Sequence, residues 1–167
     1  MSDVLSQVVN ALQLGSIYAL VALGYSMVYG IILLLNFAHG DIIMVGAYMT
    51  YYAMTTFHLH PVLSVVLAIV VSTLLGVIIE KVAYTPLRSA PRLSLLITAI
   101  GISFLLENGA QMIFGADTKS MVQTPLISGS ISIGGANITL AALLTIVVSV
   151  IAMVLLTFLV QKTKLGK

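Results

Sequence analysis

Apolar residues run almost without interruption from Val8 to Ile79, and the polar breaks of the chain divide it into stretches of membrane length. A helix needs about 20 mostly apolar residues to cross the roughly 30 Å hydrocarbon core of a bilayer. The pattern predicts an all-α integral membrane protein with about five transmembrane helices, forming a single domain over residues 1–167. The expected spans are residues 8–35, 42–57, 62–79, 93–114 and 139–160.

A polar run, Asn36-Phe37-Ala38-His39-Gly40-Asp41, separates the first two expected spans. An amide, an imidazole and a carboxylate are costly at membrane depth unless they are paired, hydrated or exposed to a pathway. Asn36, His39, Gly40 and Asp41 are therefore candidates for a translocation pathway. The alternative is a plain helix junction, in which Asn36 and Gly40 end one helix and Asp41 caps the next.

The second expected span, residues 42–57, is short and contains Gly46 together with three tyrosines. Short, glycine-interrupted segments beside a polar break are typical of a transporter's central pathway, because unwound backbone is tolerated there only where protein or water can satisfy it. Two interpretations are open: the segment crosses the membrane, or it re-enters on the same side.

Basic residues gather in two connections, and both clusters are expected in the cytoplasm by the positive-inside rule. One cluster lies in the loop of residues 80–92 and the other is the lysine-rich end, residues 161–167. Five crossings then place the N-terminus outside, whereas a re-entrant second segment places it inside. The basic residues of the first cluster are Lys81, Arg88 and Arg92.

The connection of residues 115–138 is rich in serine and glycine and carries one acid, Asp117, and one base, Lys119. It is expected to face the outside. The alternation of Ile131 and Ile133 with small residues allows a short extended piece within it.

Polar side chains also interrupt the fourth expected span. Glu107 and Asn108 lie well inside the apolar window, and Glu107 shares a helix face with Gln111. At 1.5 Å per residue, Glu107 lies about 5 Å from the midpoint of the span, where an unpaired carboxylate is expensive. Glu107 and Asn108 are therefore further pathway candidates, and the alternative for Glu107 is a protonated carboxyl that forms a structural hydrogen bond between helices.

Small residues recur along one face of the first span at spacings of four, three, four and four. Such a stripe lets the backbone of another helix approach closely. It predicts helix packing rather than a binding site. The residues are Gly15, Ala19, Ala22, Ser26 and Gly30.

Composition supports the membrane class and excludes several functions. The chain is 60% hydrophobic and 7% charged, with a mean hydropathy of +1.16, whereas soluble domains carry about 25% charged residues. Its net charge of +2 is explained by topology, so no nucleic-acid partner is expected. There are no cysteines, and His58 and His60 lack a third ligand at matching spacing, so neither a metal nor another cofactor is expected.

Motifs for catalysis were not found: there is no Gly-x-Ser-x-Gly elbow, no His-Glu-x-x-His helix and no phosphate-binding loop. The chain is therefore not expected to be an enzyme, and it cannot energise transport by itself. Three classes remain: a transporter or channel subunit, an intramembrane enzyme and a non-transporting membrane scaffold. The well-placed acids, Asp41 and Glu107, lie in unlike surroundings, which argues against an intramembrane protease, and buried polar groups argue against the scaffold.

Several motifs, in register over essentially the whole chain, resemble the permeases of bacterial branched-chain amino acid ABC transporters. They include Leu14-Gly15-Ser16-Ile17-Tyr18-Ala19-Leu20, the Asn36–Asp41 run, Tyr84-x-Pro86-Leu87-Arg88, Ile97-Thr98-Ala99-Ile100-Gly101 and Thr163-Lys164-Leu165-Gly166-Lys167.

This resemblance implies a multi-pass subunit of the bacterial inner membrane, embedded in the lipid bilayer, for leucine, isoleucine and valine. Its implied partners are a second homologous permease subunit, two cytoplasmic ATP-binding subunits and a periplasmic or extracellular solute-binding protein. A similar Ala-His-Gly segment occurs in permeases for urea and short amides, which are the alternative substrates.

Position by position, the resemblance places Asn36, His39, Gly40 and Asp41 near the translocation path. Physically, Gly40 is expected to permit a backbone turn, and Asp41 with His39 to hydrogen-bond across the break. In the family, the segment resembling residues 163–167 leads into a coupling segment and further spans, whereas the sequence stops at Lys167. A fragment, a split gene product and a truncated form are all compatible with this difference.

Overall fold

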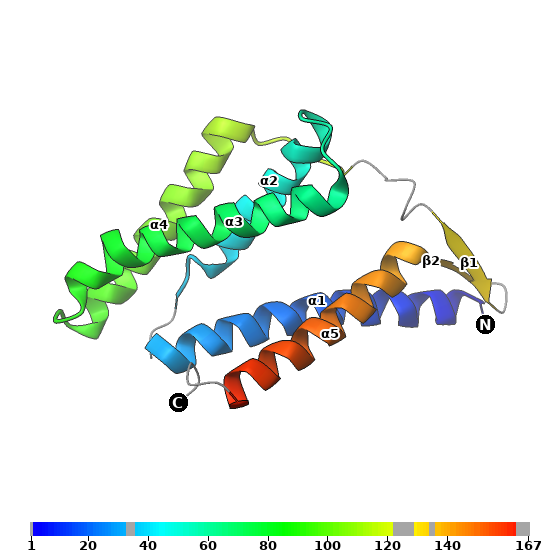
Figure 1. Ribbon diagram of the computed structural model, residues 1–167, viewed down its shortest axis with the longest axis horizontal. Coiled ribbons are helices and arrows are strands. Elements are labelled where there is room, and N and C mark those ends of the chain that lie inside the picture. The colour runs from blue at the N-terminus through cyan, green and yellow to red at the C-terminus, as the bar shows by residue number, and fades with distance from the viewer. Residues whose placement is uncertain (1, 33–35, 122–128, 134–135, 163–167) are drawn as a thin grey trace. The chain divides into compact units, whose positions relative to one another are not determined.

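The structure is a computed structural model that describes residues 2–32, 36–121, 129–133 and 136–162. Most of these described residues are helical, and one short hairpin is present, in agreement with the expected all-α class (Figure 1). The chain forms two compact units, Met1–Ile32 with Gln123–Lys167, and Leu33–Val122.

The first unit pairs the two ends of the sequence. Helices α1 (Ser2–Ile32) and α5 (Leu140–Lys162) contact each other along their lengths, and the antiparallel strands β1 (Ser130–Ile133) and β2 (Ala136–Thr139) precede α5. The hairpin confirms the extended piece expected near Ile131 and Ile133.

The small-residue stripe of α1 does not form the contact with α5. All five of its residues are exposed, and no atom lies within 4 Å of a Cβ built on either glycine of the stripe. Helix packing through this stripe therefore stays a prediction, and the helix that would pack there is not α5.

The second unit contains three helices and the basic connection (Figure 1). Helix α2 (His39–Thr55) packs against α3 (Pro61–Ile79) and α4 (Arg92–Phe114). Gly46 of α2 lies against α3, because a Cβ built on it would be 2.7 Å from the hydroxyl oxygen of Ser72. The expected loop of residues 80–92 begins as further helical turns, η1 (Glu80–Tyr84) and η2 (Thr85–Leu87), which extend α3.

Four helices among the described residues are long and apolar enough to cross a membrane: Val4–Gly30, Pro61–Leu87, Arg92–Phe114 and Leu140–Leu159. They correspond to the first, third, fourth and fifth expected spans. Helix α2 has 17 residues, or about 26 Å at 1.5 Å per residue, which is shorter than the roughly 30 Å hydrocarbon core. A fifth crossing, and with it an outside N-terminus, stays a prediction.

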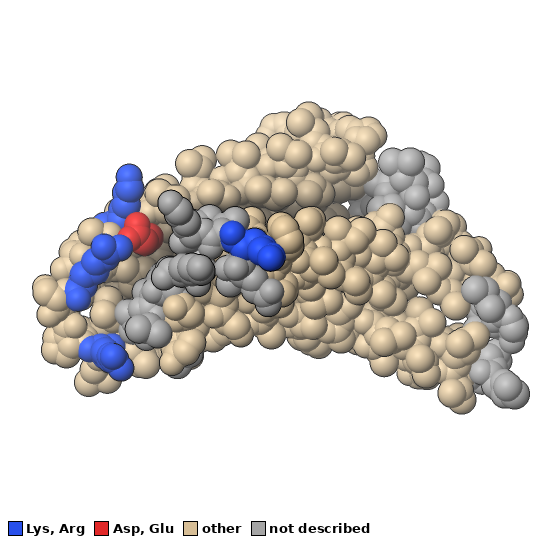
Figure 2. Space-filling view, turned by 60° about the horizontal axis from the view of Figure 1, so that its bottom comes forward, with Lys and Arg blue, Asp and Glu red and all other residues tan. Residues whose placement is uncertain are grey.

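Most basic side chains of the visible face gather, with one acid, at the end of the second unit where α3 joins α4 (Figure 2). There Arg88 Nη2 lies 3.2 Å from Glu80 Oε1, and both side chains are well exposed. The charges lie at one end of two membrane-length helices, as the positive-inside rule requires of a cytoplasmic connection.

Candidate functional site: a polar helix junction

The Asn36–Asp41 run forms the start of α2 rather than a simple gap between helices. Residues 36–38 precede the helix, and His39, Gly40 and Asp41 make up its first turn. Helix α1 ends at Ile32, and residues 33–35, the expected end of the first span, lie outside the described residues. The polar break predicted at residues 36–41 therefore ends earlier than expected, because residues 39–41 are already helical.

Asn36 organises the turn that leads into α2. Its side-chain Oδ1 accepts a hydrogen bond from the Ala38 N–H at 3.1 Å, and its carbonyl accepts one from the His39 N–H at 3.1 Å. An asparagine side chain bonded to the backbone two residues later is a common way to start such a turn. The same Oδ1 accepts a hydrogen bond from the Tyr84 hydroxyl at 2.9 Å, which ties the junction to η1.

Asp41 ties the junction to α4. Its side chain is only 7% exposed, and Oδ2 accepts a hydrogen bond from the Ser103 hydroxyl at 2.6 Å. The alternative in which Asp41 caps α2 is wrong, because the N-cap residue is Ala38 and carries no side-chain cap. The carboxylate instead joins α2 to α4 through two residues that are 62 positions apart in the sequence.

Gly40 does not supply the expected turn. It lies in the first turn of a right-handed helix, and among the described glycines a positive φ occurs at Gly115. No atom lies within 4 Å of a Cβ built on Gly40, so neither backbone strain nor close packing explains a glycine here. His39 is half-buried at the first position of the helix.

The Asp41–Ser103 bond fixes the depth of the junction within the second unit. Ser103 is the central residue of the 23-residue helix α4, so it lies about 17 Å from either end. Further along, the Tyr52 and Phe114 rings are 5.1 Å apart. Tyr52 is as many residues after Asp41 as Phe114 is after Ser103. The two helices therefore advance together from one contact to the other, so α2 runs parallel to the second half of α4.

Helix α2 therefore begins beside the middle of α4 and ends on the side opposite the basic connection, as Figure 1 also shows for the second unit. Because α4 has the length of a membrane crossing, the buried carboxylate lies near half of that thickness. This is where an ionisable group is most expensive and most indicative of a functional role.

The second pair of pathway candidates does not join this junction. Glu107 is exposed on α4, one turn beyond Ser103. The Asn108 side chain donates to the Phe104 carbonyl of its own helix at 2.7 Å. Within the described parts of the chain, neither residue is hydrogen-bonded to residues 36–41.

Sequence reasoning did not identify the two hydroxyl groups that hold the junction. Tyr84 lies in the basic connection and Ser103 lies in an apolar span, and neither has a local signal that names a distant partner. The available clue was physical: a half-buried amide and a buried carboxylate need hydrogen-bond donors from neighbouring segments.

The helices and this junction define the class of the protein: a multi-pass α-helical membrane protein with a polar helix junction inside the membrane thickness. By sequence, the chain belongs to the family of branched-chain amino acid transport system permease components, which it matches over residues 7–167.

Curated relatives agree with this family. The chain is 39% identical to the high-affinity branched-chain amino acid transport system permease protein BraD of Pseudomonas aeruginosa, over 98% of this chain and 57% of BraD. It is 36% identical to the LivH permease of Salmonella typhimurium and 35% identical to that of Escherichia coli K12, in each case over 98% of this chain and 56% of the relative. The chain thus spans little more than half the length of these relatives. No solved structure matches it.

Proposed function

We propose that this chain forms part of the translocation pathway of a bacterial ABC importer for leucine, isoleucine and valine. The observation that carries the proposal is the polar helix junction, where Ser103 holds the Asp41 carboxylate at half the length of α4 and Tyr84 holds the Asn36 amide. A scaffold gains little from burying a carboxylate in the middle of a membrane. The names of the relatives supply the substrate class.

In this proposal α2 does not cross the whole membrane. It starts at the middle of the membrane and runs to the outer surface beside α3 and α4, and the basic connection of residues 80–92 lies in the cytoplasm. A helix that starts at this depth is tolerated because neighbouring helices satisfy its polar groups. The chain has no phosphate-binding loop, so ATP-binding subunits and an external solute-binding protein act as partners, together with a second homologous permease subunit.

Asn36, His39 and Asp41 line the pathway as weakly interacting polar groups. The substrates have apolar side chains, so tight binding at mid-depth is not needed, and it would slow release to the cytoplasm. Glu107 and Asn108, exposed on the same helix that holds Ser103, extend the polar face of α4.

Uptake of labelled leucine tests the proposal. The full-length permease that contains this sequence is expressed with its ATP-binding and solute-binding partners, and unlabelled isoleucine, valine and urea are added as competitors. Isoleucine and valine are expected to compete and urea is not. Competition by urea alone would favour the amide-permease alternative, and absence of any solute flux would favour a scaffold.

Asp41→Asn tests the junction in the same assay. The asparagine oxygen can still accept the hydrogen bond from Ser103, so the protein is expected to insert normally while uptake falls several-fold because the carboxylate charge is lost. The control is Thr73→Ala, since the Thr73 hydroxyl is exposed and bonds to the Ile69 carbonyl of its own helix. Unchanged uptake by Asp41→Asn would make Asp41 a structural residue only.

A further inference from the structure

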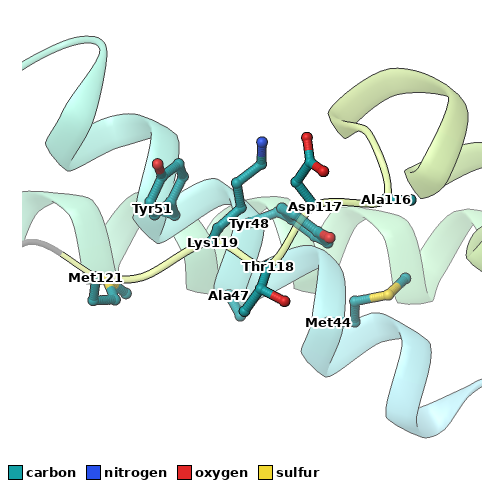
Figure 3. Close-up of a pocket in the computed structure, with 9 residues that line it drawn as sticks. All are labelled: Met44, Ala47, Tyr48, Tyr51, Ala116, Asp117, Thr118, Lys119 and Met121. Carbon is teal, nitrogen blue, oxygen red and sulfur yellow. The ribbon is translucent and has the colours of Figure 1, made fainter.

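A pocket separate from the polar junction lies in the second unit, between α2 and the segment that follows α4 (Figure 3). Its volume is about 420 Å³, within the range of about 300–1,000 Å³ that is usual for small-molecule sites. Helix α2 contributes Met44, Ala47, Tyr48 and Tyr51, and the following segment contributes two charged residues, Asp117 and Lys119.

The pocket exists because the chain reverses direction after α4. Gly115 ends that helix with φ +83° and ψ 166°, a conformation that is essentially restricted to glycine. The next residues therefore cross over α2 instead of continuing along the axis of α4 (Figure 3). The α2 wall is fixed by Tyr48, whose ring stacks on that of Phe114 at 4.5 Å and 12°.

The position of the pocket agrees with an entry site. It lies at the end of α4 opposite the basic connection, which is the outer end if that connection is cytoplasmic. Its α2 residues also continue toward the junction: Asp41, Met44, Tyr48 and Tyr51 follow each other at spacings of three, four and three, so they occupy one face of the helix. One helix face thus leads from the pocket to the buried carboxylate.

The pocket combines two opposite charges with an apolar wall. The side chains of Asp117 and Lys119 point to the same side in the close-up (Figure 3). Of the residues that the structure describes, Arg88 and Glu80 form an ion pair, whereas Asp117 and Lys119 do not pair with each other. Both charged groups are therefore available to a ligand, and Met44, Ala47 and Tyr48 offer apolar surface beside them.

We propose that this pocket is an outer binding site for the free amino acid. The Asp117 carboxylate accepts hydrogen bonds from the α-ammonium group, Lys119 donates to the α-carboxylate, and the branched side chain contacts the α2 wall. Charge-assisted hydrogen bonds give orientation, while the open, partly exposed setting keeps binding weak. The choice of amino acid rests on the proposed function, but the recognition of an ammonium and a carboxylate rests on the pocket itself.

Protection from thiol labelling measures this binding directly. The sequence contains no cysteine, so Ala47→Cys places one thiol in the pocket wall, and the unsubstituted complex gives the background from the rest of the permease. The full-length permease with its ATP-binding subunits is labelled in proteoliposomes with a membrane-impermeant maleimide, without solute-binding protein. Leucine is compared with leucinamide, which lacks the carboxylate, and 4-methylpentanoate, which lacks the ammonium group.

Leucine is expected to slow labelling, and each analogue to need about tenfold higher concentration for the same protection, because a hydrogen bond to one charged group is lost. Asp117→Asn and Lys119→Gln are each expected to raise the half-protecting leucine concentration about tenfold as well. Ser120→Ala is the matched control, since Ser120 is in the same segment and does not line the pocket. Ala116→Cys replaces Ala47→Cys if the latter fails to assemble.

Three results would overturn the proposal: no protection by leucine, equal protection by all three compounds, or unchanged protection in both charge variants. If these variants keep the normal protection by leucine but weaken the leucine uptake that the solute-binding protein supports, the segment is a docking surface for that protein and not an amino acid site. Leucine uptake is measured on the same complexes. Normal uptake without protection refutes the pocket alone, whereas absence of leucine uptake refutes the proposed function.

Discussion

The hydrogen bond between Ser103 and Asp41 places the start of α2 beside the middle of α4. Removal of this bond is therefore the most informative perturbation of this protein. Ser103→Ala deletes the donor and leaves a carboxylate that is 7% exposed with one partner fewer. The O···O distance of 2.6 Å falls within the range of charge-assisted bonds, which are about twice as strong as neutral ones.

Two scales bracket the cost. Hydrogen bonds to charged groups contribute about 1.5–3 kcal/mol in soluble proteins, whereas hydrogen bonds between membrane helices average about 0.6 kcal/mol and reach about 1.7 kcal/mol. The short distance and the burial of Asp41 place this bond near the upper end of the membrane scale. We expect Ser103→Ala to lower the free energy of unfolding by about 1.5 kcal/mol, roughly tenfold in the equilibrium constant.

A double-mutant cycle isolates the bond from other effects of each substitution. Unfolding of the purified full-length permease is followed in mixed micelles with increasing denaturing detergent, for Asp41→Ala, Ser103→Ala and the double variant. The matched control is Ser16→Ala, since that hydroxyl bonds to the Gln13 carbonyl of its own helix at 2.8 Å. A coupling energy of zero between positions 41 and 103 would refute the bond, and with it the mid-depth start of α2.

Three further substitutions test the elements around the junction and the pocket. Tyr84→Phe removes the donor to Asn36 and is expected to lower the thermal stability of the permease in detergent by about 0.5–1.5 kcal/mol; an unchanged melting temperature would contradict this contact. Gly115→Ala forces a side chain into a backbone conformation that favours glycine and is expected to lower the free energy of unfolding by roughly 1–3 kcal/mol. The same melting experiment measures this loss. The control is Gly109→Ala, because Gly109 is helical and uncrowded. Phe114→Leu removes the ring that stacks on Tyr48. It is expected to lower the free energy of unfolding by about 0.5–1.5 kcal/mol more than the lost buried apolar area accounts for. An equal loss of stability from Phe114→Leu in the Tyr48→Leu background would argue against the stack.

The membrane-length helices were predictable from hydropathy alone, because each of their apolar runs is long enough to cross a membrane. Their ends were less predictable. The basic connection begins as helical turns up to Leu87 although its composition is typical of a loop, since Glu80, Lys81 and Ala83 are good helix formers. Helix α2 starts at His39 because the Asn36 side chain begins the turn, which the sequence indicated only as a polar run.

The candidate site was predicted in part. The cost of burying Asp41 was evident from the sequence, but its partner was not, since Ser103 is a single hydroxyl in an apolar span and the contact depends on how α2 and α4 pack. The sequence made Glu107 a pathway candidate for the same reason as Asp41, but Glu107 is exposed in the structure. Position along a span gives the depth of a residue, whereas the face that it occupies is decided by tertiary packing.

In the proposed function, the start of α2 beside the middle of α4 matters for how a zwitterion would cross the membrane. Water can hydrate both charges of an amino acid at either surface, so protein groups are needed chiefly in the middle of the membrane, where water is scarce. In that proposal the second unit supplies such a group at Asp41, and the face of α2 that follows it carries Met44 and Tyr48, which line the proposed outer pocket. A longer α2 that began at the surface would place the Asp41 carboxylate there, where water already hydrates the charges of an amino acid. Under the proposed function, starting the helix beside the middle of α4 instead brings this carboxylate to the level where those charges would lack solvent.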